Sequence, residues 1–371
     1  MPIHFTEERW ARIEDDYTAW WSGELKRPII HVTLHGFEPD RNGPPVEHPP
    51  PRTAGYYVDG EADADRIVDQ WDYQLSGQRW LGDGFPSVCP DFGPGIIAGC
   101  MGCKVEIEPS TVWFSPPRDA EITDITLRYD PNHVWSRRLE SVMGSAIRRW
   151  DRDVVVGMTD LGGNMDIVAS FRHTDDLLMD LYDEPEAVER VLAEAHEGWW
   201  AAFEQLNDTL FPANRGYSAW TPMFSRDPYY MLQCDFAYMI SPDMFDRFIK
   251  PELEATCRRL ANPFYHLDGP GQLPHLDRLL AIPELKGIQW VPGDGQPDIT
   301  HWPEVYRRVR AAGKRIQFFS GQSSEHGHHA LDIIADQLGS AEGICMIHHV
   351  GKDQIDDVSE LLTRHGCPTD L

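Results

Sequence analysis

The feature that most constrains the fold of this chain is a repeated order of short apolar segment, Gly- and Asp-rich turn, and longer amphipathic segment. Short apolar runs bounded by turn residues predict buried strands. Because each following helix carries the chain back across the sheet, this order requires parallel strands. Strands are predicted at residues 28–34, 154–160, 264–268, 287–291, 315–320 and 343–348.

Helix signals separate these strands. A first helix is predicted at about residues 7–22, where Trp10, Tyr17, Trp20 and Trp21 follow the helical spacing of a packing face. Further helices are predicted from residues 183, 241 and 302 onward, each opening with a proline close to its first turn.

Two architectures fit alternating parallel strands and helices, a closed (β/α)8 (TIM) barrel and an open doubly wound sheet. A Gly-rich phosphate-binding turn, expected after the first strand of a nucleotide-binding open sheet, is absent here. We therefore predict the α/β class with one (β/α)8-barrel domain spanning residues 1–371. Residues 1–27 are predicted to form an N-terminal helix packed on the barrel, and the Pro-rich residues 38–52 a surface loop.

The composition indicates which binding partners are disfavoured and in which cellular compartment the protein is expected. The chain has 33 Lys and Arg against 60 Asp and Glu, a formal charge of −27, which disfavours nucleic acid and anionic membrane surfaces as partners. Its seven cysteines are an odd number, typical of reduced thiols. With no signal peptide and no long apolar run, we expect a cytoplasmic protein that acts on a small molecule. A homodimer is compatible with the sequence, although no feature requires one.

Polar residues gather where the predicted strands end. In a (β/α)8 barrel the loops after the strands form the active site, so these residues are candidates for chemistry. Asp235 belongs with them because it shortly precedes a predicted helix start. The remaining candidates at or after strand ends are Asp160, Asn164, Asp166, His266, Asp268, Gln289, Trp290, Gln322, Cys345, His348 and His349.

The pair His266 and Asp268 carries the most specific chemical signal. Residues two apart in a strand point to the same face, so both side chains converge on one point. That arrangement suits a metal ion or an oriented general base; the alternative is a hydrogen-bonded pair that holds a loop. On the last predicted strand, the side chains of Cys345 and His349 would point to one face, and that of His348 would point to the opposite face. We predict a zinc site formed by His266 and Asp268 with one of these last-strand residues.

Several other residues are predicted to bind substrate. Arg172 would grip a carboxylate or phosphate, which implies a small, polar, anionic organic molecule; otherwise it is a surface arginine. Trp220 and Trp290 would form an apolar wall, or belong to the core. Amides and carboxylates would orient the substrate. These residues are Asn164, Asp166, Gln289 and Gln322, with Asp160, Asp235 and His266 as catalytic groups. Asp160 and Asp166 could instead cap the helix that follows them.

At these same positions, residues 150–365 resemble the uroporphyrinogen decarboxylase-like superfamily. That group includes zinc-dependent methyltransferases that serve corrinoid proteins, and it is related to cobalamin-independent methionine synthase. The most specific stretch, residues 234–251, is similar to the family segment "D....LSP..F..F..P". Weaker likenesses cover residues 155–169, 265–269 and 344–351, and residues 288–293 resemble a branch labelled trimethylamine-corrinoid-associated.

The resemblance implies the barrel fold and metal-assisted methyl transfer. Family methyltransferases hold zinc by a His, a Cys two residues later and a Cys on the last strand. This chain has His266, replaces the first Cys with Asp268, and offers Cys345, His348 or His349 for the second. The arginine set that would bind a porphyrinogen is missing around Arg27. The chain has no corrinoid-binding motif, so a corrinoid would arrive on a partner protein.

We therefore expect an enzyme that transfers a methyl or similar group with the help of zinc. The main alternative is a metal-free decarboxylase or lyase, in which Asp160 or Asp235 stabilises positive charge and His266 donates a proton. A third possibility is a non-catalytic binding partner of a corrinoid protein.

Overall fold

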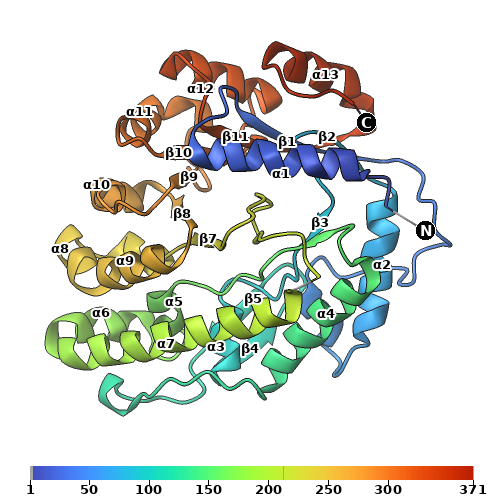
Figure 1. Cartoon of the computed structure of the whole chain (residues 1–371). Helices are drawn as coiled ribbons and strands as arrows, with labels where there is room; N and C mark the ends of the chain where they lie inside the picture. The colour runs from blue at the N-terminus through green and yellow to red at the C-terminus, as the bar shows by residue number, and fades with distance from the viewer. Residues whose placement is uncertain (1–2, 212, 371) are drawn as a thin grey trace.

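The computed structural model describes residues 3–211 and 213–370, and a mostly parallel sheet forms its centre. Figure 1 shows the strands toward the middle of the molecule and the helices around them. The strands are β1 (Ile29–His35), β2 (Arg79–Gly82), β3 (Ser87–Val88), β4 (Lys104–Ile107), β5 (Val112–Ser115), β6 (Val155–Val156), β7 (Tyr229–Leu232), β8 (Asn262–Asp268), β9 (Gly287–Val291), β10 (Arg315–Phe319) and β11 (Ile344–Gly351).

The helices vary from single turns to one of 26 residues, α7. They are α1 (Glu7–Ser22), α2 (Ala64–Ser76), α3 (Ile96–Cys100), α4 (Val134–Trp150), α5 (Asn164–Ala169), α6 (Thr174–Asp183), α7 (Pro185–Leu210), α8 (Pro242–Met244), α9 (Lys250–Arg259), α10 (Leu276–Leu280), α11 (Pro303–Ala311), α12 (Ala330–Leu338) and α13 (Ile355–Arg364). Across the described part of the chain, no helix is both long and apolar enough to cross a membrane. Residues 38–52 contain neither helix nor strand.

The central sheet has seven strands in the order β2-β1-β11-β10-β9-β8-β7. Every neighbouring pair is parallel except β1 and β2. Strands β3 and β6 form a separate parallel pair, and β4 and β5 form an antiparallel hairpin. The predicted α/β class with parallel strands is therefore present.

The continuous barrel ladder expected from the sequence is not observed among the described residues. The pair β3–β6 does not join the seven-stranded sheet, and the predicted strand at 154–160 is reduced to Val155–Val156. On one side, a single parallel bridge links Met158 to Ala219. On the other, the antiparallel β2 occupies the edge of β1. An isolated bridge replaces regular pairing at the first gap, and an antiparallel edge strand replaces it at the second.

The strand register places chemically distinctive side chains in one row. His266 on β8 pairs with Gln289 on β9, which pairs with Gln317 on β10. Gln317 in turn pairs with Cys345 on β11, and Cys345 with Ile29 on β1. Partnered residues of parallel strands face the same side of the sheet. One face of the sheet therefore carries an imidazole, two amides and a thiol side by side.

Helix α1 covers the amino-terminal ends of the strands. The Thr6 hydroxyl accepts a hydrogen bond from the Arg9 backbone N–H (3.3 Å) and caps the helix. Arg315, the first residue of β10, donates to the Trp20 carbonyl (2.7 Å). The Trp20 ring also stacks on Phe264, near the start of β8. This cover leaves the opposite, carboxyl-terminal ends of the strands for a site.

The packing of Trp10 attaches α1 to the hydrophobic core. Its ring is fully buried and lies 5.8 Å from Phe85 and 6.4 Å from Phe224. Replacing a buried Trp with Ala leaves a cavity that costs about 3–5 kcal/mol. We expect Trp10→Ala to lower the free energy of unfolding, measured by urea denaturation, by that amount. The control Trp113→Ala, at a site 57% exposed, should change it little; equal losses would contradict this role.

Candidate active site

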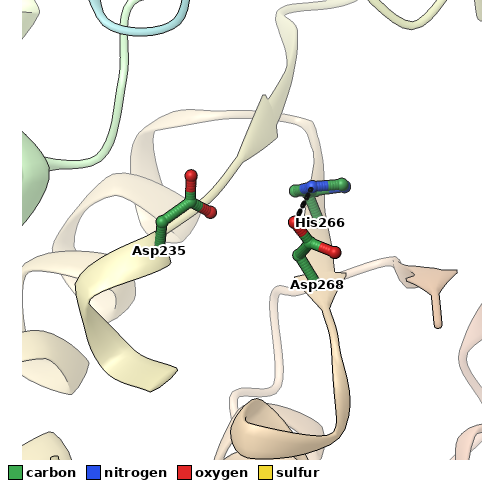
Figure 2. A group of neighbouring side chains, drawn as sticks. All are labelled: Asp235, His266 and Asp268. Atoms are coloured by element: carbon green, nitrogen blue, oxygen red, sulfur yellow. Dashed lines mark ion pairs between the residues drawn. The ribbon is translucent and has the colours of Figure 1, made fainter. Parts of the chain in front are cut away.

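Three side chains converge at the carboxyl ends of β7 and β8. His266 and Asp268 lie two apart in β8, and Asp235 begins the short 3₁₀ helix η3 (Asp235–Met239) that follows β7. Potential ligand atoms of the three residues all lie within 4.8 Å of one another, and His266 Nε2 is 3.8 Å from Asp268 Oδ2. Figure 2 shows the three side chains facing a common point. We call them the Asp-His-Asp cluster.

Buried amides fix the orientation of the His266 ring. Its Nδ1 is hydrogen bonded to Gln289 Oε1, and Gln289 Nε2 donates to Gln317 Oε1. The edge of the Trp220 ring also packs against the imidazole, with ring centroids 5.2 Å apart. Because an amide oxygen can only accept, Nδ1 carries the hydrogen in this arrangement. Nε2 is therefore the nitrogen left to meet Asp268, a proton or a metal.

Negative charge dominates around the cluster. Burial opposes the charged form of His266, but the hydrogen bond and charge of Asp268, with the charge of Asp235, raise the pKa of the imidazole. Desolvation raises the pKa of Asp235; His266 opposes that shift, whereas Asp268 adds to it. Two carboxylates facing one imidazole form a site that a cation would stabilise.

Two further carboxylates support this region. Asp160, which follows β6, accepts hydrogen bonds from the Gly162 N–H (2.9 Å) and Gln233 Nε2 (3.2 Å). Burial raises the pKa of Asp160 to about 6, with a further contribution from the charge of Asp235. Asp166 accepts from the backbone N–H of Asp235 (3.0 Å) and of Phe236 (2.8 Å). Asp166 thus holds the start of η3, where Asp235 lies, rather than the start of its own helix.

A cavity of about 350 Å³ opens beside Asp235. One wall comes from the β4–β5 hairpin, and others come from η3 and from α5. Its polar lining includes Asp166 and the Gln233 amide. The cavity is large enough for a small organic molecule.

Some of the predicted substrate-binding residues lie apart from the cluster. Arg172 donates to Asp180 (2.8 Å), the Ala120 carbonyl (2.8 Å) and Glu121 (2.9 Å), so its guanidinium is committed elsewhere. Trp290 follows Gln289 in β9 and therefore faces the other side of the sheet, where it packs on Trp302.

Asn164 and Gln322 also lie outside the Asp-His-Asp cluster. Asn164 Nδ2 donates to Glu252 (2.6 Å) and lies 3.1 Å from His196 Nδ1, within a separate polar group. Gln322 lies in the 3₁₀ turn η7 (Ser320–Gln322) after β10, and its Oε1 is buried without a hydrogen-bond partner among the described residues.

The last strand does not supply the third member of the cluster. Cys345 is buried within β11, and burial raises the pKa of its thiol well above the usual range. His349 lies near His35, with ring centroids 5.9 Å apart, and His348 bonds to the Ser320 hydroxyl (2.5 Å). Strand β11 is separated from β8 by β9 and β10, whereas β7 is the direct neighbour of β8. Asp235 consequently occupies the place that the sequence analysis gave to Cys345 or His349.

Gln317, Gln233 and the hairpin wall of the cavity are not among the residues predicted from the sequence. Gln317 carried a signal, because a polar residue at the centre of an apolar strand requires a buried hydrogen-bond partner. The hairpin at residues 104–115 carried no comparable signal. Its position over the cavity depends on contacts far apart in the sequence.

Comparison with known proteins gives a likeness to solved structures. No family model and no curated protein sequence matches the chain. Among solved structures, a methyltransferase from Methanosarcina mazei aligns with a TM-score of 0.59, covering 91% of this chain and 93% of that chain at 13% sequence identity. At this identity the likeness shows a shared fold.

The raised pKa of Asp160 predicts a pH dependence of stability. Between its ordinary value of 3.8 and about 6, the folded protein keeps a proton that the unfolded chain has lost. This contribution to stability is present below about pH 4 and is lost as pH rises through 6. Asp160→Asn, which stays neutral, should therefore gain stability relative to the wild type from pH 4 to 7, measured by urea denaturation.

The control is Asp119→Asn, whose side chain is 97% exposed. Its profile should run parallel to that of the wild type. If the stability of Asp160→Asn and that of the wild type changed in parallel with pH, the raised pKa of Asp160 would be contradicted.

Proposed function

We propose that the protein is a metal-dependent enzyme that transfers a methyl group, with zinc held by the Asp-His-Asp cluster. The observation that carries this proposal is the convergence of one imidazole and two carboxylates within 4.8 Å. Imidazole nitrogen and carboxylate oxygen are both established ligands of Zn²⁺. The hydrogen bond from His266 Nδ1 to Gln289 is the kind of outer contact that orients a metal-binding histidine.

The reaction class is supported by two independent likenesses. The chain shares the fold of a methyltransferase. Its residues 234–251 resemble the uroporphyrinogen decarboxylase-like superfamily, and its residues 265–269 resemble the zinc-dependent methyltransferases of that group. Asp235, His266 and Asp268 all fall within these two stretches. We also propose that β1, β3, β6 and β7 to β11 are the strands of an irregular (β/α)8 barrel, whose two gaps are covered by side chains and loops.

The donor set differs from a thiolate-rich site. A zinc ion bound here would act as a Lewis acid toward an oxygen, nitrogen or sulfur atom of the substrate. Asp235 and Asp268 would hold the ion, while the amides of Gln289 and Gln317 keep His266 in position. Asp160, with a pKa of about 6, is a group that holds or releases a proton near the cluster.

A corrinoid protein is the partner that the family resemblance favours. Because this chain has no corrinoid-binding motif, the cofactor would be presented by another polypeptide at the open ends of the strands. We expect free methylcobalamin to replace that partner in an assay.

The proposal is tested by methyl transfer from methylcobalamin to a thiol, followed by the change in the corrinoid absorption spectrum. Zinc-loaded protein should catalyse the reaction, and both metal removal and His266→Ala should abolish it. Gln289→Leu should weaken zinc binding by about tenfold to a hundredfold, because it removes the hydrogen bond that orients the ligating histidine.

Zinc content separates this function from its main rival. About one zinc per chain is expected in the wild type and in the loop variant His326→Ala, but not in His266→Ala. Unchanged zinc content in His266→Ala would show that His266 is not a zinc ligand and would contradict the proposed metal site. A metal-free protein that protonates or decarboxylates substrate would instead favour a lyase in which His266, with its raised pKa, is the acid.

A further inference from the structure

The cavity beside the Asp-His-Asp cluster has aromatic walls. Trp113 and Phe114 of β5 line one side, and Phe236 of η3 lines another. Trp113 is 57% exposed, although an indole is among the side chains that gain most from burial. Its exposure at the rim of a cavity is therefore more consistent with a ligand contact than with a role in the core.

The charged side chains among the described residues that line this cavity are all carboxylates. Asp166 and Asp235 both belong to its lining, whereas no Lys, Arg or His is found among the described residues that form it. The nearby Arg172 is bound to Asp180 and Glu121 and lines a different pocket. An anion placed here would face two carboxylates without a counter-charge, which is strongly unfavourable away from bulk water.

Asp166 contributes charge to the cavity rather than a free ligand atom. Its two carboxylate oxygens accept the N–H groups of Asp235 and Phe236, one each. It is therefore poorly placed to bind a second metal ion directly. In its ionised form the carboxylate would attract a diffuse organic cation across the cavity.

We propose that this cavity binds a small organic cation with alkyl groups on its nitrogen. The carboxylates of Asp166 and Asp235 would attract the charge, and the faces of Trp113, Phe114 and Phe236 would contact the alkyl groups through cation–π attraction. This ligand replaces the anionic substrate expected from the sequence. Its assignment as the substrate rests on the proposed function, but its binding requires no metal.

Calorimetric titration with three probes tests the charge preference. Choline and 3,3-dimethylbutan-1-ol have nearly the same shape and differ in the positive charge, and methanesulfonate is a small anion. Choline should bind at least about tenfold more tightly than the neutral alcohol, because the cation–π and carboxylate attractions together exceed about 1.4 kcal/mol. Methanesulfonate should show no binding. Equal affinities for choline and the alcohol, or preferential binding of methanesulfonate, would overturn the proposal.

Variants identify the residues responsible. Trp113→Ala should weaken choline binding by about fivefold or more, whereas Trp113→Phe should retain most of it. Asp166→Asn should weaken choline binding more than it weakens binding of the neutral alcohol, because only choline loses an attraction to the carboxylate charge. The control Tyr182→Ala removes an aromatic side chain that is 71% exposed and lies outside the cavity, so it should have no effect. Unchanged choline affinity in Trp113→Ala would contradict the aromatic contact.

The metal state distinguishes failure of this proposal from failure of the proposed function. Choline binding should persist in chelator-treated protein and in His266→Ala, because the aromatic walls and Asp166 lie outside the cluster. If zinc binds but choline does not, the cation site is wrong and the metal site stands. If choline binds and zinc does not, the cation site stands alone.

Discussion

The register of β8, β9 and β10 determines the direction of the His266 side chain, and the geometry of the candidate site depends on it. Pairing of His266 with Gln289 and of Gln289 with Gln317 aligns an imidazole and two amides on one face of the sheet. Their hydrogen bonds run in one direction, so that His266 Nε2 remains available at the open end. Shifting one strand by a single residue would turn its member of the row to the opposite face.

Excess negative charge is the second property that shapes this region. Asp160, Asp166 and Asp235 all have raised pKa values, mainly because burial disfavours their charged forms. Mutual repulsion adds to the cost, and proteins usually relieve it with protons, metal ions or bound cations. A divalent metal at the cluster and an organic cation in the adjacent cavity would each relieve part of it.

Local patterns in the sequence predict much of this arrangement. The strands at β8 to β11 follow from short apolar runs between turns, and the shared direction of His266 and Asp268 follows from the two-residue period of a strand. The two gaps in the ladder were not predictable, because they depend on pairings between distant segments, such as the bridge from Met158 to Ala219. Asp235 was recognised as a candidate, but its place in the cluster depends on two backbone hydrogen bonds to Asp166.

The most direct test of the account is the absorption spectrum of the protein after titration with Co²⁺, which replaces zinc and reports the type of ligand. The Asp-His-Asp cluster predicts saturable binding of one ion per chain, with weak visible bands and no thiolate-to-cobalt charge-transfer band. His266→Ala should lose this spectrum. An intense near-ultraviolet thiolate band, which would show a cysteine ligand, or the absence of bound cobalt would contradict the account.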